Sequence, residues 1–145
     1  METLLNVHSY LAYVVLALLI VAVGNAFLGL AGKRMFTLER DFRISLFALI
    51  ISHIQLLIGL AVYFTSPNGL QAIRQFGMGG LSPEARLLAL EHPLINIVAV
   101  VLITIGWSRH KKFMEGDRKF KAIGYLYGLG LLLLVSRIPW DLWIG

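Results

Sequence analysis

Apolar residues dominate the chain in four long runs that are separated by three more polar segments. A run of about 20 mainly apolar residues is long enough to cross the hydrocarbon core of a bilayer as a helix. The predicted spans cover residues 4–31, 44–64, 84–108 and 120–138. The pattern therefore predicts an all-α fold, an integral membrane up-down four-helix bundle that forms a single domain over residues 1–145.

Composition supports the membrane class. Hydrophobic residues make up 58% of the chain and charged residues 14%, with a mean hydropathy of +0.78, which is outside the usual range of a soluble domain. The chain has no cysteine, which excludes disulfides, thiolate metal ligands, c-type haem attachment and iron–sulfur clusters. Any cofactor must then be held by histidine or carboxylate. The net charge of +5 comes from residues that flank apolar runs, so the expected partner is the lipid bilayer and not nucleic acid.

The distribution of basic residues predicts an orientation. Four Lys or Arg residues lie in or beside the first loop and six in or beside the third, against two at the second. The positive-inside rule then places the first and third loops in the cytoplasm, and both termini on the outer side. The sequence RHKK at 109–112, which includes His110, is interpreted as a solvated cytoplasmic helix end. We expect a multi-pass protein of the bacterial inner membrane.

Four ionisable residues are the most costly to place in the apolar zone of the predicted spans: His8, His53, Glu91 and His92. Such residues are rare in membrane helices because burial removes their solvation, and each one is by default a candidate functional residue. A single histidine can simply hydrogen-bond a neighbouring helix. Three imidazoles and a carboxylate in one small bundle favour a bound cofactor or metal instead.

Depth in the bilayer selects a pair among the histidines. Counting inward from the outer boundary at about 1.5 Å per residue, His8 and His92 lie about 9 Å deep and His53 about 16 Å deep. The first and third spans are diagonal neighbours in a sequentially connected bundle, so His8 and His92 face one central space. The favoured interpretation is that they are the axial ligands of a haem b, with His53 as the substitute ligand.

A proline, a carboxylate and an arginine complete the candidate site. Pro93 lies inside the third span, where a proline frees a carbonyl group and bends the helix next to Glu91 and His92. Glu91 has three candidate roles, which are to orient a ligating imidazole, to accept a proton, or to pair with Arg137. Arg137 either extends to a lipid phosphate or binds a haem propionate or a quinone-like head group. Asn96 lies one turn after His92 on the same helix face.

Several sequence segments resemble one family. They are HSYLAY, SHIQLLIGLAVYFTSP, LEHPLINIVAVVLITIGWSRHKK and SRIPW, and together they extend over nearly the whole chain. The chain resembles a family of small four-span membrane proteins of Bacteroidota that is often labelled cytochrome b-like. The resemblance implies haem binding through His8, His53 and His92, with Glu91 alongside. The family pattern has an arginine–tryptophan pair where this chain has alanine and tyrosine at 12–13, which raises the importance of Arg137.

Three functions remain open at this point. The first is a b-type haem-binding membrane protein for electron transfer, with a quinone or a respiratory membrane complex as partner. The second is a site in which the three imidazoles and Glu91 bind copper, zinc or iron, since imidazole suits all three metals. The third is a non-catalytic structural subunit of a membrane complex, and association into a homo-oligomer fits each of them. No nucleophile–base arrangement or phosphate-binding glycine loop is evident, so any enzymatic activity is expected to be redox and not hydrolytic.

Overall fold

The computed structural model describes residues 1–144, and within that range it contains helices and no strand. The long helices are α1 (Glu2–Ala31), α2 (Arg43–Thr65), α5 (His92–His110) and α6 (Gly116–Ser136). Four helical stretches in this range are long and apolar enough to cross a membrane. The prediction of an all-helical chain with four candidate spans is therefore confirmed for the described residues.

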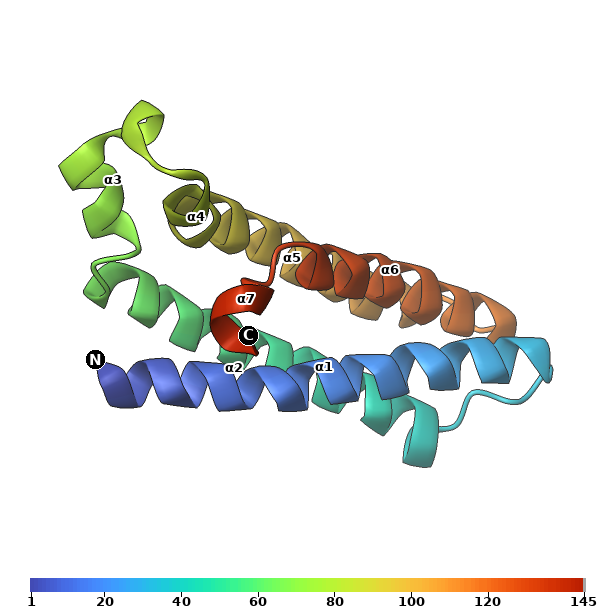
Figure 1. Cartoon of the computed structure of the whole chain (residues 1–145). Coiled ribbons are helices and arrows are strands. Elements are labelled where there is room, and N and C mark those ends of the chain that lie inside the picture. The colour runs from blue at the N-terminus through green and yellow to red at the C-terminus, as the bar shows by residue number, and fades with distance from the viewer. Residues whose placement is uncertain (145) are drawn as a thin grey trace.

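The four long helices form a closed ring of neighbours (Figure 1). α1 packs against α2 and α6, and α5 packs against the same two helices, so α1 and α5 lie diagonally across the bundle. The N-terminus and the α2–α5 connection lie at one end, the C-terminus lies part-way along α1 from that end, and the other two connections lie at the opposite end. The core is fully buried around Leu19, Ile103 and Tyr127. The side of the membrane that each end faces stays a prediction.

A buried carboxylate holds the connection between α1 and α2 in place. This connection ends in a π-helical turn, η1 (Leu38–Phe42), which is capped by the side chain of Thr37. Asp41 is 0% exposed and accepts hydrogen bonds from the Thr37 backbone N–H and the Asn25 side chain, each at 2.8 Å. The Arg34 guanidinium lies 3.3 Å from the same carboxylate. The turn is thereby tied to the end of α1.

The third candidate span is one continuous helical stretch built from three parts. It begins with α4 (Pro83–Arg86), continues through a π-helical turn, η3 (Leu87–Glu91), and goes on as α5. Ser82 caps the start, because its hydroxyl accepts a hydrogen bond from the third residue of the stretch. Pro93 lies just after the π-helical turn, inside the stretch, as the sequence predicted. π-turns of this kind disturb the regular hydrogen-bond ladder and are often found at functional sites.

Short helices lie toward the end of the bundle that holds the N-terminus. The α2–α5 connection contains α3 (Leu70–Phe76) and a 3₁₀ turn, η2 (Met78–Gly80), and forms an arch at this end (Figure 1). Gly69 begins the arch, and a Cβ there would lie 2.1 Å from the Tyr63 carbonyl oxygen, so the close approach requires glycine. After α6, the chain turns into α7 (Trp140–Trp143), which lies beside α1, where the ring centroids of Trp143 and Tyr13 are 4.5 Å apart.

Candidate functional site

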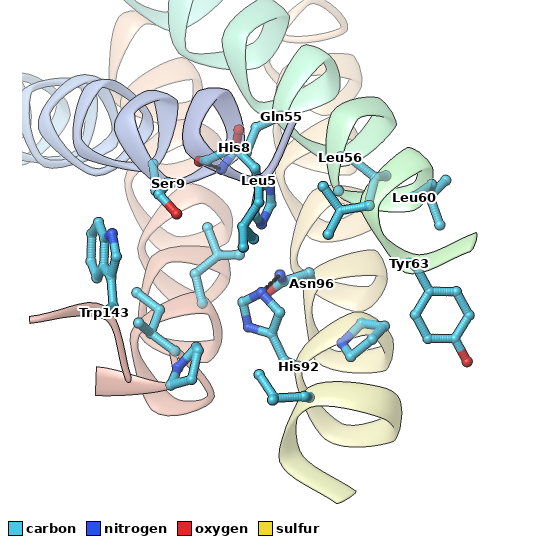
Figure 2. Close-up of a pocket in the computed structure, with 18 of the residues that line it drawn as sticks. Leu5, His8, Ser9, Gln55, Leu56, Leu60, Tyr63, His92, Asn96 and Trp143 are labelled. Atoms are coloured by element: carbon cyan, nitrogen blue, oxygen red, sulfur yellow. Dashed lines mark hydrogen bonds between the residues drawn. The ribbon is translucent and has the colours of Figure 1, made fainter. Parts of the chain in front are cut away.

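A cavity of about 310 Å³ lies between α1, α2, α5 and α7 (Figure 2). Its volume is at the lower end of the range for small-molecule pockets, roughly 300–1,000 Å³. Most of its lining is apolar and includes leucine side chains of α1, α2 and η3. The polar groups of the lining include the side chains of His8, Gln55, His92, Asn96 and Trp143. The cavity therefore combines an apolar enclosure with a few polar groups, which is the usual composition of a ligand site.

The structure brings two of the three predicted histidines together. The ring centroids of His8, on α1, and His92, on α5, are 6.3 Å apart, and the ring planes are inclined by 82°. In Figure 2 the ring of His92 lies below that of His8. The His8 ring lies against Gly59 of α2, where an added Cβ would be only 3.0 Å from His8 Cε1. The absence of a side chain at this position of α2 leaves room for the imidazole.

Hydrogen bonding determines which nitrogen of His92 carries the lone pair. His92 Nδ1 lies 2.8 Å from the backbone carbonyl oxygen of Arg137. A carbonyl can only accept, so Nδ1 carries the proton and, in the neutral ring, Nε2 carries the lone pair. The amide nitrogen of Asn96 lies 3.1 Å from Nε2 and donates to it. In metal-binding histidines, the ring N–H that does not face the metal typically donates a hydrogen bond to a carbonyl or a carboxylate in this way. This hydrogen bond orients the nitrogen that binds the metal.

Glu91 and Arg137 form an ion pair beside the cavity. Arg137 Nε lies 3.5 Å from Glu91 Oε1, and both side chains are partly exposed. Among the three candidate roles of Glu91, the observed geometry corresponds to an ion pair with Arg137. Arg137 thus contacts two successive residues, because its side chain meets Glu91 and its carbonyl meets His92. The adjacent glutamate and histidine together tie the third span to the end of the fourth.

His53 lies apart from the other two histidines and does not line the cavity. Its Nδ1 is 2.8 Å from the Leu49 carbonyl oxygen, and its Nε2 is 3.2 Å from the Thr104 hydroxyl of α5. His53 therefore bridges α2 and α5. Within residues 1–144, no three histidine or acidic side chains form a group that could hold a metal ion. The predicted grouping of three imidazoles with Glu91 is not seen in that range.

His110 differs from its sequence-based interpretation. The solvated helix end was expected to include it, yet the residue is only 1% exposed. Its ring packs against the rings of Phe36, Phe42 and Trp107, and its Nδ1 is hydrogen-bonded to the Trp107 carbonyl. The prediction was wrong because the aromatic residues of the α1–α2 connection fold over this end of α5 and cover the ring.

Sequence reasoning missed Gln55, whose amide nitrogen donates to the His8 carbonyl oxygen at 2.8 Å. The signal was a polar amide inside an apolar span, two residues after His53. Four atoms around the cavity, namely His8 Nδ1, Gln55 Oε1, Asn96 Oδ1 and Trp143 Nε1, are buried and have no hydrogen-bond partner among the described residues. An unpaired buried polar atom costs about 1–3 kcal/mol, so such atoms often mark a place where a ligand or water binds.

No family model, no curated protein and no solved structure matches the chain. The chemistry of the cavity therefore has to be inferred from its own geometry. Two imidazole rings lie 6.3 Å apart in an edge-to-face arrangement inside a mostly apolar enclosure, and one of them has its tautomer fixed by a backbone carbonyl. This arrangement suits coordination between the two rings.

Proposed function

We propose that this protein is a membrane-embedded b-type haem protein for electron transfer, with His8 and His92 as the axial ligands. The separation of the two rings carries the proposal. A metal–imidazole bond is about 2 Å long, so two imidazoles on one metal have ligating nitrogens about 4 Å apart and ring centres roughly 6 Å apart. The observed distance between the ring centroids is 6.3 Å.

The surroundings of the two histidines fit such a group. The lining is mostly apolar, as a macrocycle requires, and Gly59 leaves space for the His8 ring. The Arg137 carbonyl holds His92 in the tautomer whose Nε2 can ligate. The Arg137 side chain is half exposed beside the cavity and is available to a propionate in exchange for Glu91. When bound, haem would supply a one-electron redox couple with both axial positions occupied, which suits electron transfer.

The location of the cavity suggests its partners. It lies toward the end of the bundle that holds the N-terminus, and the distribution of basic residues predicts that this end faces the outer side of a bacterial inner membrane. Its leucine-rich lining lies between helices that are expected to face lipid. A lipid-soluble quinone or a membrane complex of the respiratory chain is accordingly the proposed redox partner.

Absorption spectroscopy tests the proposal. The protein is expressed with added haem precursor, purified in detergent, and measured oxidised and after dithionite. We expect a sharpened α band and a shifted Soret band on reduction, with loss of both in His8→Ala and in His92→Ala. His53→Ala is the matched control, because the same change is made in the same bundle but outside the cavity, and it should keep its haem. A featureless spectrum would overturn the proposal, and full haem in His92→Ala would overturn the axial assignment.

The same pair of imidazoles supports a second candidate, a copper, zinc or iron site without a porphyrin. Imidazole suits each of these metals. The two rings supply only two ligands, and no third histidine or acidic group joins them within residues 1–144, so water or a bound molecule would complete the coordination. Metal analysis of the purified protein separates the two candidates. A stoichiometric metal without a haem spectrum favours this second one.

A further inference from the structure

Asn96 forms a hydrogen bond to the lone pair through which His92 would bind a metal. Asn96 lies one helical turn after His92 on α5, and its amide nitrogen is 3.1 Å from His92 Nε2 (Figure 2). Both residues line the cavity. The contact is local to one helix, so it does not depend on a ligand to bring the two side chains together.

The direction of this hydrogen bond follows from the other bonds of the ring. His92 Nδ1–H already donates a hydrogen bond to the Arg137 carbonyl oxygen, which can only accept. Nε2 is then an acceptor, and only the NH₂ end of the Asn96 amide can face it. The opposite end of the amide, Oδ1, is buried and has no partner among the described residues. Reversing the amide would set its oxygen against the Nε2 lone pair, so the orientation shown is the one that chemistry allows.

We propose that Asn96 is a gating residue for the haem site. In the ligand-free protein its amide N–H forms a hydrogen bond to the Nε2 lone pair of His92, and this hydrogen bond would have to break for iron to bind there. This inference rests on the proposed function. Because a metal–nitrogen bond and an N–H···N hydrogen bond need the same lone pair, the two exclude each other. Asn96 therefore lowers the affinity of His92 for any metal, and its side chain must rotate away from Nε2 in the loaded protein.

Two substitutions of similar size give opposite expectations. Asn96→Leu keeps a comparable shape but cannot donate, so haem should bind more tightly, by about two- to tenfold, the range that one net hydrogen bond is worth. Asn96→Asp replaces the donor with an acceptor, which stabilises a proton on Nε2. His92 would then donate from both nitrogens and have no lone pair, so haem binding should weaken by tenfold or more. A residue needed only for packing would weaken binding in both variants.

The experiment combines a haem titration with a measurement on the haem-free protein. Haemin is titrated into the purified protein and followed by the Soret band, with protein-free micelles as blank. ¹⁵N NMR of the histidine rings should show a protonated Nδ1 at His92 in the wild type, and an Nε2 resonance that moves in Asn96→Leu. Asn6→Leu and Asn6→Asp are matched controls on the exposed face of α1 and should change neither reading.

The outcomes separate the two proposals. Haem that binds to the wild type and equally or less tightly to Asn96→Leu overturns the gating role and leaves the proposed function standing. A proton on Nε2 of His92 in the haem-free wild type also overturns it. A wild type that binds no haem, with Nδ1 protonated as expected, overturns the proposed function instead. Tighter binding by Asn96→Leu together with weaker binding by Asn96→Asp supports both.

Discussion

Gly59→Ala is expected to separate haem affinity from stability. A Cβ at this position would lie 3.0 Å from His8 Cε1, and its three nearest neighbours are all atoms of the His8 ring. Ordinary carbon–carbon contact begins at about 3.5 Å, so the ring must move by about 0.5 Å. Ligating groups need to be held to within roughly 0.5 Å of their productive geometry. The His8 ring would thus be displaced to the limit of what coordination tolerates, and we expect haem affinity to fall by tenfold or more.

The stability of the same variant should change little. Overpacking costs about 1–3 kcal/mol, while replacing glycine by alanine inside a helix gains about 1 kcal/mol, so the two effects largely oppose each other. Haem titration and denaturant unfolding in detergent measure the two quantities. Gly24→Ala is the matched control, since nothing lies within 4 Å of its added Cβ, and it should gain stability and keep its haem affinity. Unchanged haem affinity in Gly59→Ala would refute the reasoning, because the displaced ring would then not be a ligand.

Three further changes test particular contacts. Tyr127→Phe removes a buried hydroxyl that donates to the Ser45 carbonyl at 2.9 Å, and it should lower the free energy of unfolding by about 0.5–1.5 kcal/mol in denaturant; an unchanged midpoint would contradict this. Asp41→Asn leaves the Arg34 guanidinium without its buried carboxylate, and a loss of about 3 kcal/mol or more is expected in the same assay, whereas a loss below 1 kcal/mol would refute it. Arg137→Ala removes the guanidinium but keeps the backbone carbonyl that orients His92, so the reduced absorption spectrum should keep its bis-histidine form. A high-spin spectrum would contradict the role of this carbonyl in orienting His92.

The helices were predictable because apolar runs report directly on helix position. The predicted span 44–64 corresponds to α2 (Arg43–Thr65), and 84–108 corresponds to the stretch Pro83–His110. Depth counting also placed His8 and His92 at one level, since rise per residue is nearly constant along a helix. Their proximity across the bundle then follows from the diagonal placement of α1 and α5.

Other features depended on the tertiary structure. Depth alone does not give the direction in which a side chain points, and the rotation of α2 turns His53 toward Thr104 and away from the cavity. The burial of His110 required aromatic residues from a distant connection. These positions depend on how helices are rotated and packed, which the apolar pattern of one helix does not encode.

The glutamate, histidine and proline in the third span illustrate the division. The sequence by itself determined that Glu91 and His92 are ionisable residues in an apolar span, next to a proline that disturbs the helix. Only the tertiary structure decided what they contact, namely the side chain and the carbonyl of Arg137. The physical reason is that every residue type carries the same backbone carbonyl, so a residue pattern cannot show which carbonyl accepts the hydrogen bond. The chain path at the end of α6 puts this carbonyl beside His92, and with it determines which ring nitrogen faces Asn96.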